Sequence, residues 1–88
     1  MEKNINVKHD KEEQVFYADL GGAVAELSYT IPSDQTIDMM HTYVPVEHRG
    51  HGIGEKLVET ALAYAKENNY RVIPSCSFVA RYVHRQHR

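Results

Sequence analysis

The sequence has a single cysteine, Cys76, among its 88 residues. No disulfide can therefore form within the chain, and a reducing compartment is the simpler expectation. The first residues, "MEKNINVKHDKEE", lack the apolar stretch of a secretory signal peptide, and no run of about 18 apolar residues occurs anywhere. We therefore expect a cytoplasmic protein that has no membrane partner.

An excess of charge of one sign is also missing. Ten lysines and arginines stand against 12 aspartates and glutamates, for a formal net charge of -2. Nucleic-acid-binding domains are usually strongly basic, so we expect no nucleic-acid partner. No repeat, low-complexity tract or linker interrupts the sequence, which has 42% hydrophobic and 25% charged residues. This composition and length predict one globular domain over residues 1–88.

The first half of the chain has the pattern of β-strands. Segments rich in β-favouring residues, with partial alternation of apolar and polar side chains, occupy residues 4–10, 12–20, 23–31 and 36–44. The residues expected to turn or stop the chain between them are Asp10, Lys11, Gly21, Gly22 and Pro32. The sequence thus predicts a hairpin followed by two further strands.

The fourth of these segments alternates most regularly. Its pattern places Ile37, Met39, His41 and Tyr43 on one face of the strand and the residues between them on the other. Pro45 removes a backbone donor, so we expect the strand to be interrupted there.

The period changes after residue 52. Apolar residues recur at helical spacing at Ile53, Leu57, Val58, Ala61, Leu62 and Ala65. This helix should stop near Asn68 and Asn69, which tolerate the left-handed conformation. Residues 70–74, "YRVIP", predict a short buried strand, and Ser75 is expected to cap a final helix with Phe78, Val79, Tyr82 and Val83 on its inner face. The fold class is α+β in the order β-β-β-β-α-β-α.

Three glycines crowd the junction between the fourth strand and the long helix, in "RGHGIG", residues 49–54. Free backbone N–H groups and the helix dipole favour an anion at such a junction, and glycines let a phosphate approach closely. The spacing fits neither a P-loop nor G-x-G-x-x-G. A purely structural turn is the alternative that this motif alone leaves open.

The residues Arg49, Gly52 and Gly54 satisfy the pattern Arg/Gln-x-x-Gly-x-Gly/Ala. This motif resembles the pyrophosphate-binding signature of the GNAT acetyltransferase superfamily. The stretch from about His41 to about Val83 is similar to the short single-domain branch of that superfamily, which has a "P-x-C-x-F/Y" segment near the C-terminus, here "PSCSF". The first three strands match by their order only.

The resemblance implies a minimal GNAT-like fold and a cofactor, acetyl-CoA or coenzyme A. The fold would be a mostly antiparallel mixed sheet whose fourth and fifth strands run parallel and splay apart to hold the pantetheine. Its amides would pair with exposed strand backbone at Val44 and Val46, and the pyrophosphate would rest on the N–H groups of residues 50–54 beside Arg49. The expected cofactor-binding residues are Val44, Val46, Arg49, Gly50, His51, Gly52, Ile53, Gly54, Phe78 and Tyr82. Phe78 and Tyr82 can equally be core residues.

Two residues are candidates for catalysis. Histidine is a common general base in catalysis, and His41 lies shortly before Val44, although it can also be a half-buried strand residue. Cys76 would lie at the positive end of the final helix, which lowers a thiol pKa, although a single buried cysteine is often inert. Because parallel strands bring their carboxyl ends to one edge, we expect His41 and Cys76 to approach each other.

The resulting hypothesis is acetyl transfer from acetyl-CoA to an amine or protein acceptor. Either His41 activates the amine for direct attack, or Cys76 accepts the acetyl group first. A non-catalytic CoA-binding module is the alternative, and a thioesterase using Cys76 and His41 is a third. Ordinary members of the superfamily place two helices between their first strands, where this chain has only "DLGGAVAEL". The acceptor side is therefore expected to be open.

The remaining polar residues near these motifs carry weaker expectations. His48 and His51 flank the glycines, but no third ligand at sensible spacing completes a zinc site, so no metal is expected. Arg81, Arg85 and Arg88 either meet the 3′-phosphate of CoA or form a solvated helix end.

Overall fold

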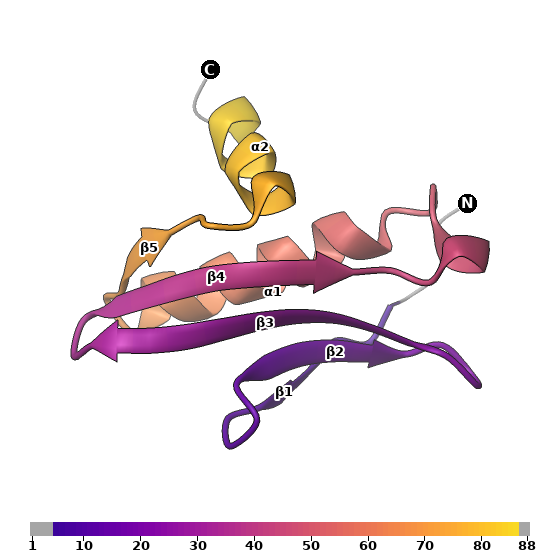
Figure 1. The fold of residues 1–88 in the computed structure, drawn as a ribbon, viewed down its shortest axis with the longest axis horizontal. Coiled ribbons are helices and arrows are strands. Elements are labelled where there is room, and N and C mark those ends of the chain that lie inside the picture. The colour runs from indigo at the N-terminus through magenta and orange to yellow at the C-terminus, as the bar shows by residue number, and fades with distance from the viewer. Residues whose placement is uncertain (1–4, 87–88) are drawn as a thin grey trace.

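A five-stranded sheet in the order β1-β2-β3-β4-β5 carries the fold in the computed structural model, which describes residues 5–86 (Figure 1). The strands are β1 (Lys8–Asp10), β2 (Val15–Asp19), β3 (Val24–Ser33), β4 (Thr36–Tyr43) and β5 (Arg71–Ile73). The first four pair in antiparallel fashion, and β5 runs parallel to β4. The predicted α+β class and mixed sheet are confirmed.

Two helices complete the predicted element order. A short 3-10 helix, η1 (Val46–His48), follows β4 and leads to α1 (Ile53–Glu67), and α2 (Ser77–Gln86) follows β5. Figure 1 shows α1 crossing behind the sheet, while α2 lies beyond the β4 side of it. Neither helix of the part described here has the length and apolar character that spanning a membrane requires.

The core lies between the sheet and α1. The largest side chains that are fully buried there are Phe16, Leu27, Ile37, Met39, Leu57, Val58 and Val79. The predicted apolar stripe of α1 is confirmed, since Ile53, Ala61 and Ala65 are buried with Leu57 and Val58. The helix ends as expected at Asn68, and the next residue, Asn69, has a φ of 58°.

A β-bulge changes the direction of side chains along β4. Tyr29 pairs with Met39, whereas Ser28 pairs with His41, so Met40 is an extra residue in the ladder. An extra residue exchanges the two faces of the strand beyond it. The bulge therefore separates two halves of β4 with opposite side-chain alternation.

The predicted face of β4 is correct only before the bulge. Ile37 and Met39 are fully buried, but His41 and Tyr43 are exposed. Beyond the bulge it is Thr42 whose register partner, Leu27, is a core residue. The prediction that His41 and Tyr43 lie on the same face as Ile37 and Met39 was wrong, because no local pattern in the sequence indicates the bulge.

Three shorter features also differ from the predictions. The strand β5 is not buried, since Arg71 is exposed and Ile73 is 38% exposed, because it lies at the sheet edge with β4 as its partner. The third strand continues past Pro32 to Ser33. The final helix begins at Ser77, two residues after the predicted cap.

The N-terminal hairpin is attached to the core through an aromatic cluster around His9. The His9 ring stacks on Phe16 with a centroid separation of 4.0 Å and meets Tyr64 edge-on. Its Nε2 lies 2.6 Å from the Tyr29 hydroxyl. Burial raises the pKa of Tyr29 to about 12, so this hydroxyl keeps its proton at ordinary pH.

We expect His9 to make stability pH-dependent. Burial and the nearby charge of Lys11 lower its pKa, and Asp10 opposes this only in part. The folded pKa then lies below the unfolded one, near 6.5, so this stabilisation is complete above that value and is lost as pH falls through the folded pKa. Thermal unfolding at pH values from about 7.5 to 5 should show a larger loss of stability for the native chain than for His9→Gln. Equal losses would contradict this role of His9.

Candidate functional site

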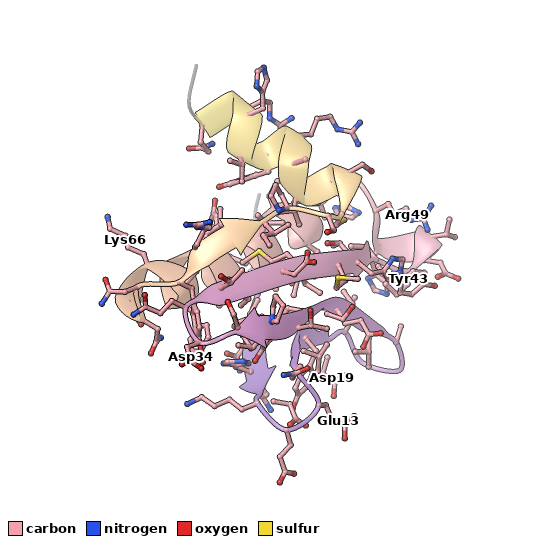
Figure 2. The ribbon with its side chains drawn as sticks, turned by 60° about the vertical axis from the view of Figure 1, so that its left-hand side comes forward. Glu13, Asp19, Asp34, Tyr43, Arg49 and Lys66 are labelled. Carbon is pink, nitrogen blue, oxygen red and sulfur yellow. The ribbon has the colours of Figure 1, made fainter. Side chains whose placement is uncertain are left out.

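A cavity of about 500 Å³ lies where β4 ends and α1 begins. Its lining residues come from the end of β4, the turn after η1, the first turn of α1 and the start of α2. They are Thr42, Tyr43, Val44, His48, Arg49, Gly50, Gly52, Ile53, Gly54, Glu55 and Phe78. Figure 2 shows Tyr43 and Arg49 together at this end of the molecule, with Lys66 at the opposite end.

Two of the three glycines give the turn its shape. Gly50 and Gly52 have φ values of 82° and 79°, in the left-handed region that other residues rarely adopt. Gly52 is the N-cap of α1, and its carbonyl accepts the first helical hydrogen bond from the Lys56 N–H at 3.0 Å. The N–H groups of the first turn of α1 therefore border the cavity, in an arrangement that suits an anion.

Gly54 serves a different purpose. It is buried in the first turn of α1, and a Cβ atom at this position would lie 2.9 Å from Cζ of Phe78. The ring of Phe78, which α2 supplies, thus packs directly on the backbone of α1 beside the cavity. The third glycine of the motif permits this close approach of the two helices.

The side chain of Arg49 bonds back to the backbone before η1. Its Nε donates a hydrogen bond of 2.8 Å to the Val44 carbonyl. That carbonyl is one of the backbone groups expected to receive a ligand amide, and here Arg49 already occupies it. The terminal guanidinium nitrogens of Arg49 are not used in this bond, so they remain donors at the cavity wall.

Val46 does not provide strand backbone. It begins η1 and its side chain is 66% exposed, so the prediction of an extended strand there was wrong. The cause is Pro45, which is buried and caps η1, so the chain turns immediately after Val44.

Cys76 occupies the N-cap position of α2, the place that the sequence assigned to Ser75. Its carbonyl accepts the Ala80 N–H at 2.9 Å, and its own N–H donates to the Met39 carbonyl at 2.9 Å. The thiol lies 3.5 Å from Oγ1 of Thr42, to which it donates. A cavity residue, Thr42, therefore connects the thiol to the cavity.

The surroundings of Cys76 favour its thiolate. Burial raises the pKa of the thiol. Once the thiol is ionised, however, its sulfur accepts hydrogen bonds from the Thr42 hydroxyl and from the Val79 and Phe78 backbone, and these outweigh burial, so the pKa is lowered. These two backbone groups belong to the first turn of α2, where the helix dipole also favours negative charge.

His41 and Cys76 are not brought together. Thr42 pairs with the buried Leu27, whereas His41 pairs with Ser28, so adjacent residues of β4 point to opposite faces of the sheet. Thr42 contacts the thiol, and His41 is exposed on the other face. The bulge at Met40 is again the reason.

The other predicted site residues divide into two groups. Those that line the cavity are Val44, Arg49, Gly50, Gly52, Ile53, Gly54 and Phe78. His51 is exposed outside it, and Tyr82 is buried between the helices, with its hydroxyl donating to Glu59 at 3.1 Å. Arg81 and Arg85 are exposed on α2, while Arg88 lies outside the described residues.

Sequence reasoning missed Thr42, Tyr43, His48 and Glu55 as cavity residues. His48 and Glu55 directly flank "RGHGIG", so their position beside the motif was a usable signal. Thr42 and Tyr43 depend on the bulge. No residue pattern in the strand marked them.

Removing the Thr42 hydroxyl should make Cys76 less reactive. Thr42→Val keeps the shape but deletes a hydrogen bond that lowers the thiol pKa. We expect alkylation by iodoacetamide near pH 7 to slow several-fold, with the pH–rate profile displaced to higher pH. Thr30→Val, an exposed change on β3, is the control and should leave the profile unchanged. An unchanged profile for Thr42→Val would refute the role of this hydroxyl.

The fold and the cavity together define the class of protein to which the chain belongs. A mixed sheet whose fourth strand leads through a glycine turn into a helix, beside a parallel fifth strand, has the architecture of the GNAT acetyltransferases. Residues 15–88 match the family described as GCN5-related N-acetyl-transferase. The chain belongs to this family.

Known proteins agree with this assignment. The chain is 32% identical to Protein NATD1 of Xenopus tropicalis over 82 residues, which cover 91% of this chain and 75% of that protein. It is 32% identical to Protein NATD1 of Homo sapiens over 81 residues, covering 90% and 72%. The NMR solution structure of a GCN5-like protein from Staphylococcus aureus superimposes with a TM-score of 0.74 at 34% identity, covering 96% of this chain and 82% of that one.

Proposed function

We propose that the chain is an acetyl-CoA-dependent N-acetyltransferase that acts on an amine or protein acceptor, in a reducing, cytoplasmic setting. The observation that carries this proposal is the shared cavity. One end is formed by the glycine turn and the N-terminus of α1, and the other end by Thr42, which contacts the thiol of Cys76. A phosphate-bearing thioester needs both kinds of surroundings in one place.

The residues at the turn fit a pyrophosphate. Nothing lies within 4 Å of a Cβ built at Gly50 or Gly52, so these positions are open on the cavity side. The N–H groups of residues 50–54 and the free guanidinium nitrogens of Arg49 would hold the two phosphates. When bound, acetyl-CoA supplies an activated acyl group as a thioester.

The chain's own residues favour a covalent route over direct transfer. The Cys76 thiolate, stabilised by Thr42 and the N-terminus of α2, would attack the thioester carbonyl and take the acetyl group, with the CoA thiolate leaving and accepting a proton from water. The acceptor amine would then attack S-acetyl-Cys76, regenerating the thiolate and losing its own proton. That proton would pass to solvent, since His41 lies on the opposite face of the sheet from Thr42 and the thiol. His41 stays the candidate base for the alternative, direct transfer.

One assay separates this function from the two alternatives. Release of free CoA thiol is measured with acetyl-CoA alone and with an added lysine-containing peptide, whose acetylation is followed by mass spectrometry. A transferase releases CoA in step with peptide acetylation. Without an acceptor, the covalent route releases at most one CoA per chain, as Cys76 becomes acetylated. Continued release beyond this amount without an acceptor indicates a thioesterase, and binding of acetyl-CoA with no release indicates a non-catalytic module. Either of these results would overturn the proposal.

A further inference from the structure

The face of the sheet turned away from α1 is not covered by a helix within residues 5–86. The buried residues of β2 and β3 point toward α1, and the residues between them point to the opposite side, here called the outer face. Figure 1 shows this side of the sheet toward the viewer, with α1 behind the sheet and α2 beyond its β4 side. An uncovered sheet face of this kind is available to a partner.

A row of three side chains crosses the centre of the outer face. Tyr17 of β2, Glu26 of β3 and Tyr43 of β4 are directly in register. Glu26 is exposed, and Tyr43 is 45% exposed. A carboxylate between two aromatic rings attracts a cation by charge and by cation–π interaction.

The charge around this row has one dominant sign. Asp10, Asp19 and Asp38 occupy outer-face positions on β1, β2 and β4, in addition to Glu26. Among the described strand residues, the lysines and arginines at outer-face positions are Lys8 of β1 and Arg71 of β5, at the two ends of the strand order, so acidic groups outnumber basic ones. The face is therefore complementary to a positively charged partner. Long-range attraction of this kind mainly raises the rate of encounter and is weakened by salt.

The outer face also leads to the proposed reaction site. Tyr43 belongs both to the row and to the cavity lining. The pairing of β4 with β5 ends at Asp38, and Cys76 follows β5 after two further residues, bonded to the Met39 carbonyl. A side chain crossing the edge of β4 beyond this point passes from the outer face toward the thiol.

From this arrangement we infer that the outer face docks the acceptor, and that the acceptor is a basic peptide segment bearing a lysine. Glu26, Tyr17 and Tyr43 hold one cationic side chain of the segment, while a neighbouring lysine reaches over the edge of β4 toward Cys76. This inference rests on the proposed acetyl transfer. It adds the class of acceptor and the surface that recognises it.

The test is a ¹⁵N NMR titration with a short blocked peptide that carries one lysine flanked by arginines, without acetyl-CoA. We expect shifts of the amides of β2, β3 and β4, and a Kd about fivefold higher for Glu26→Gln, the factor that corresponds to about 1 kcal/mol. Glu67→Gln removes an equal charge from an exposed position on α1 and should bind like the native chain. A peptide with glutamates in place of the arginines should not bind.

Four results would contradict docking of a basic peptide on the outer face. Equal Kd values for Glu26→Gln and Glu67→Gln, shifts confined to other surfaces, or equal binding of the acidic peptide would overturn the inference. So would sedimentation showing that two copies of the chain associate through this face. Stabilisation by acetyl-CoA is measured separately on Glu26→Gln and should equal that of the native chain. If acetyl-CoA does not stabilise even the native chain, that result counts against the proposed function and not against the docking surface.

Discussion

Gly54→Val is expected to lower the stability of the fold by about 1–3 kcal/mol and to remove the stabilisation that acetyl-CoA provides. A Cβ alone would come within 2.9 Å of Cζ of Phe78, and valine adds two further methyl groups in the same crowded place. Valine is a slightly better helix former than glycine, so helix propensity alone would raise the stability. This gain is too small to offset the steric overlap with Phe78. In a domain of this size a loss of about 2 kcal/mol lowers Tm by roughly 10 °C. Thermal unfolding with and without acetyl-CoA measures both effects.

A double-mutant cycle isolates the contact between position 54 and the ring of Phe78. Phe78→Leu removes the distal ring atoms that meet position 54, so Gly54→Val combined with Phe78→Leu should be more stable than the sum of the two single changes predicts. Ala63→Val, on the exposed side of α1, controls for placing valine in this helix and should cost well under 1 kcal/mol. Additive effects of Gly54→Val and Phe78→Leu would show that the ring does not set the requirement for glycine.

Cys76→Ser is expected to abolish formation of an acetyl adduct and to reduce acetyl transfer by at least about 100-fold. Serine is a good N-cap, so α2 and the fold should be retained. Its hydroxyl is a poor nucleophile without an adjacent base, and the side chain that bonds the side chain of position 76 is that of Thr42, which is not a base. Intact-mass spectrometry after incubation with acetyl-CoA should show one added acetyl group on the native chain and none on Cys76→Ser.

The neighbouring serine supplies the matched control. Ser75 is exposed and lies before the helix cap, so Ser75→Ala should keep the adduct, the activity and the stability within about 0.5 kcal/mol. Direct transfer predicts the reverse pattern for the cysteine, with no adduct on the native chain and turnover that survives in Cys76→Ser. That result would leave His41 as the candidate base and remove the covalent route.

The order of strands and helices was predictable because the spacing of apolar residues within most segments indicates a strand or a helix. The apolar spacing from Ile53 to Ala65 specifies α1 almost to the residue, and Gly21 with Gly22 marks the turn between β2 and β3. The parallel pairing of β4 with β5 came from the resemblance to a family, and the structure confirms it. Local patterns and the resemblance together were therefore sufficient for the topology.

The chemistry around Cys76 was predictable only in part. The positive end of α2 was expected, and the lowered thiol pKa agrees with it. The partner of the thiol was not, because the bulge at Met40 depends on how β3 and β4 pair and not on either strand alone. That single extra residue replaces His41 by Thr42 beside the thiol. Whether His41 and Cys76 carry the catalytic roles proposed for them stays a prediction.

The central claim is that the cavity beneath "RGHGIG" binds a CoA thioester, and thermal stability in the presence of ligand tests it most directly. Acetyl-CoA at ~100 times its Kd should stabilise the chain by about 2.7 kcal/mol, a rise in Tm of roughly 10 °C or more for a domain of this size. CoA should act similarly, and ATP should have little effect. A rise in Tm with ATP and none with acetyl-CoA or CoA would contradict the account.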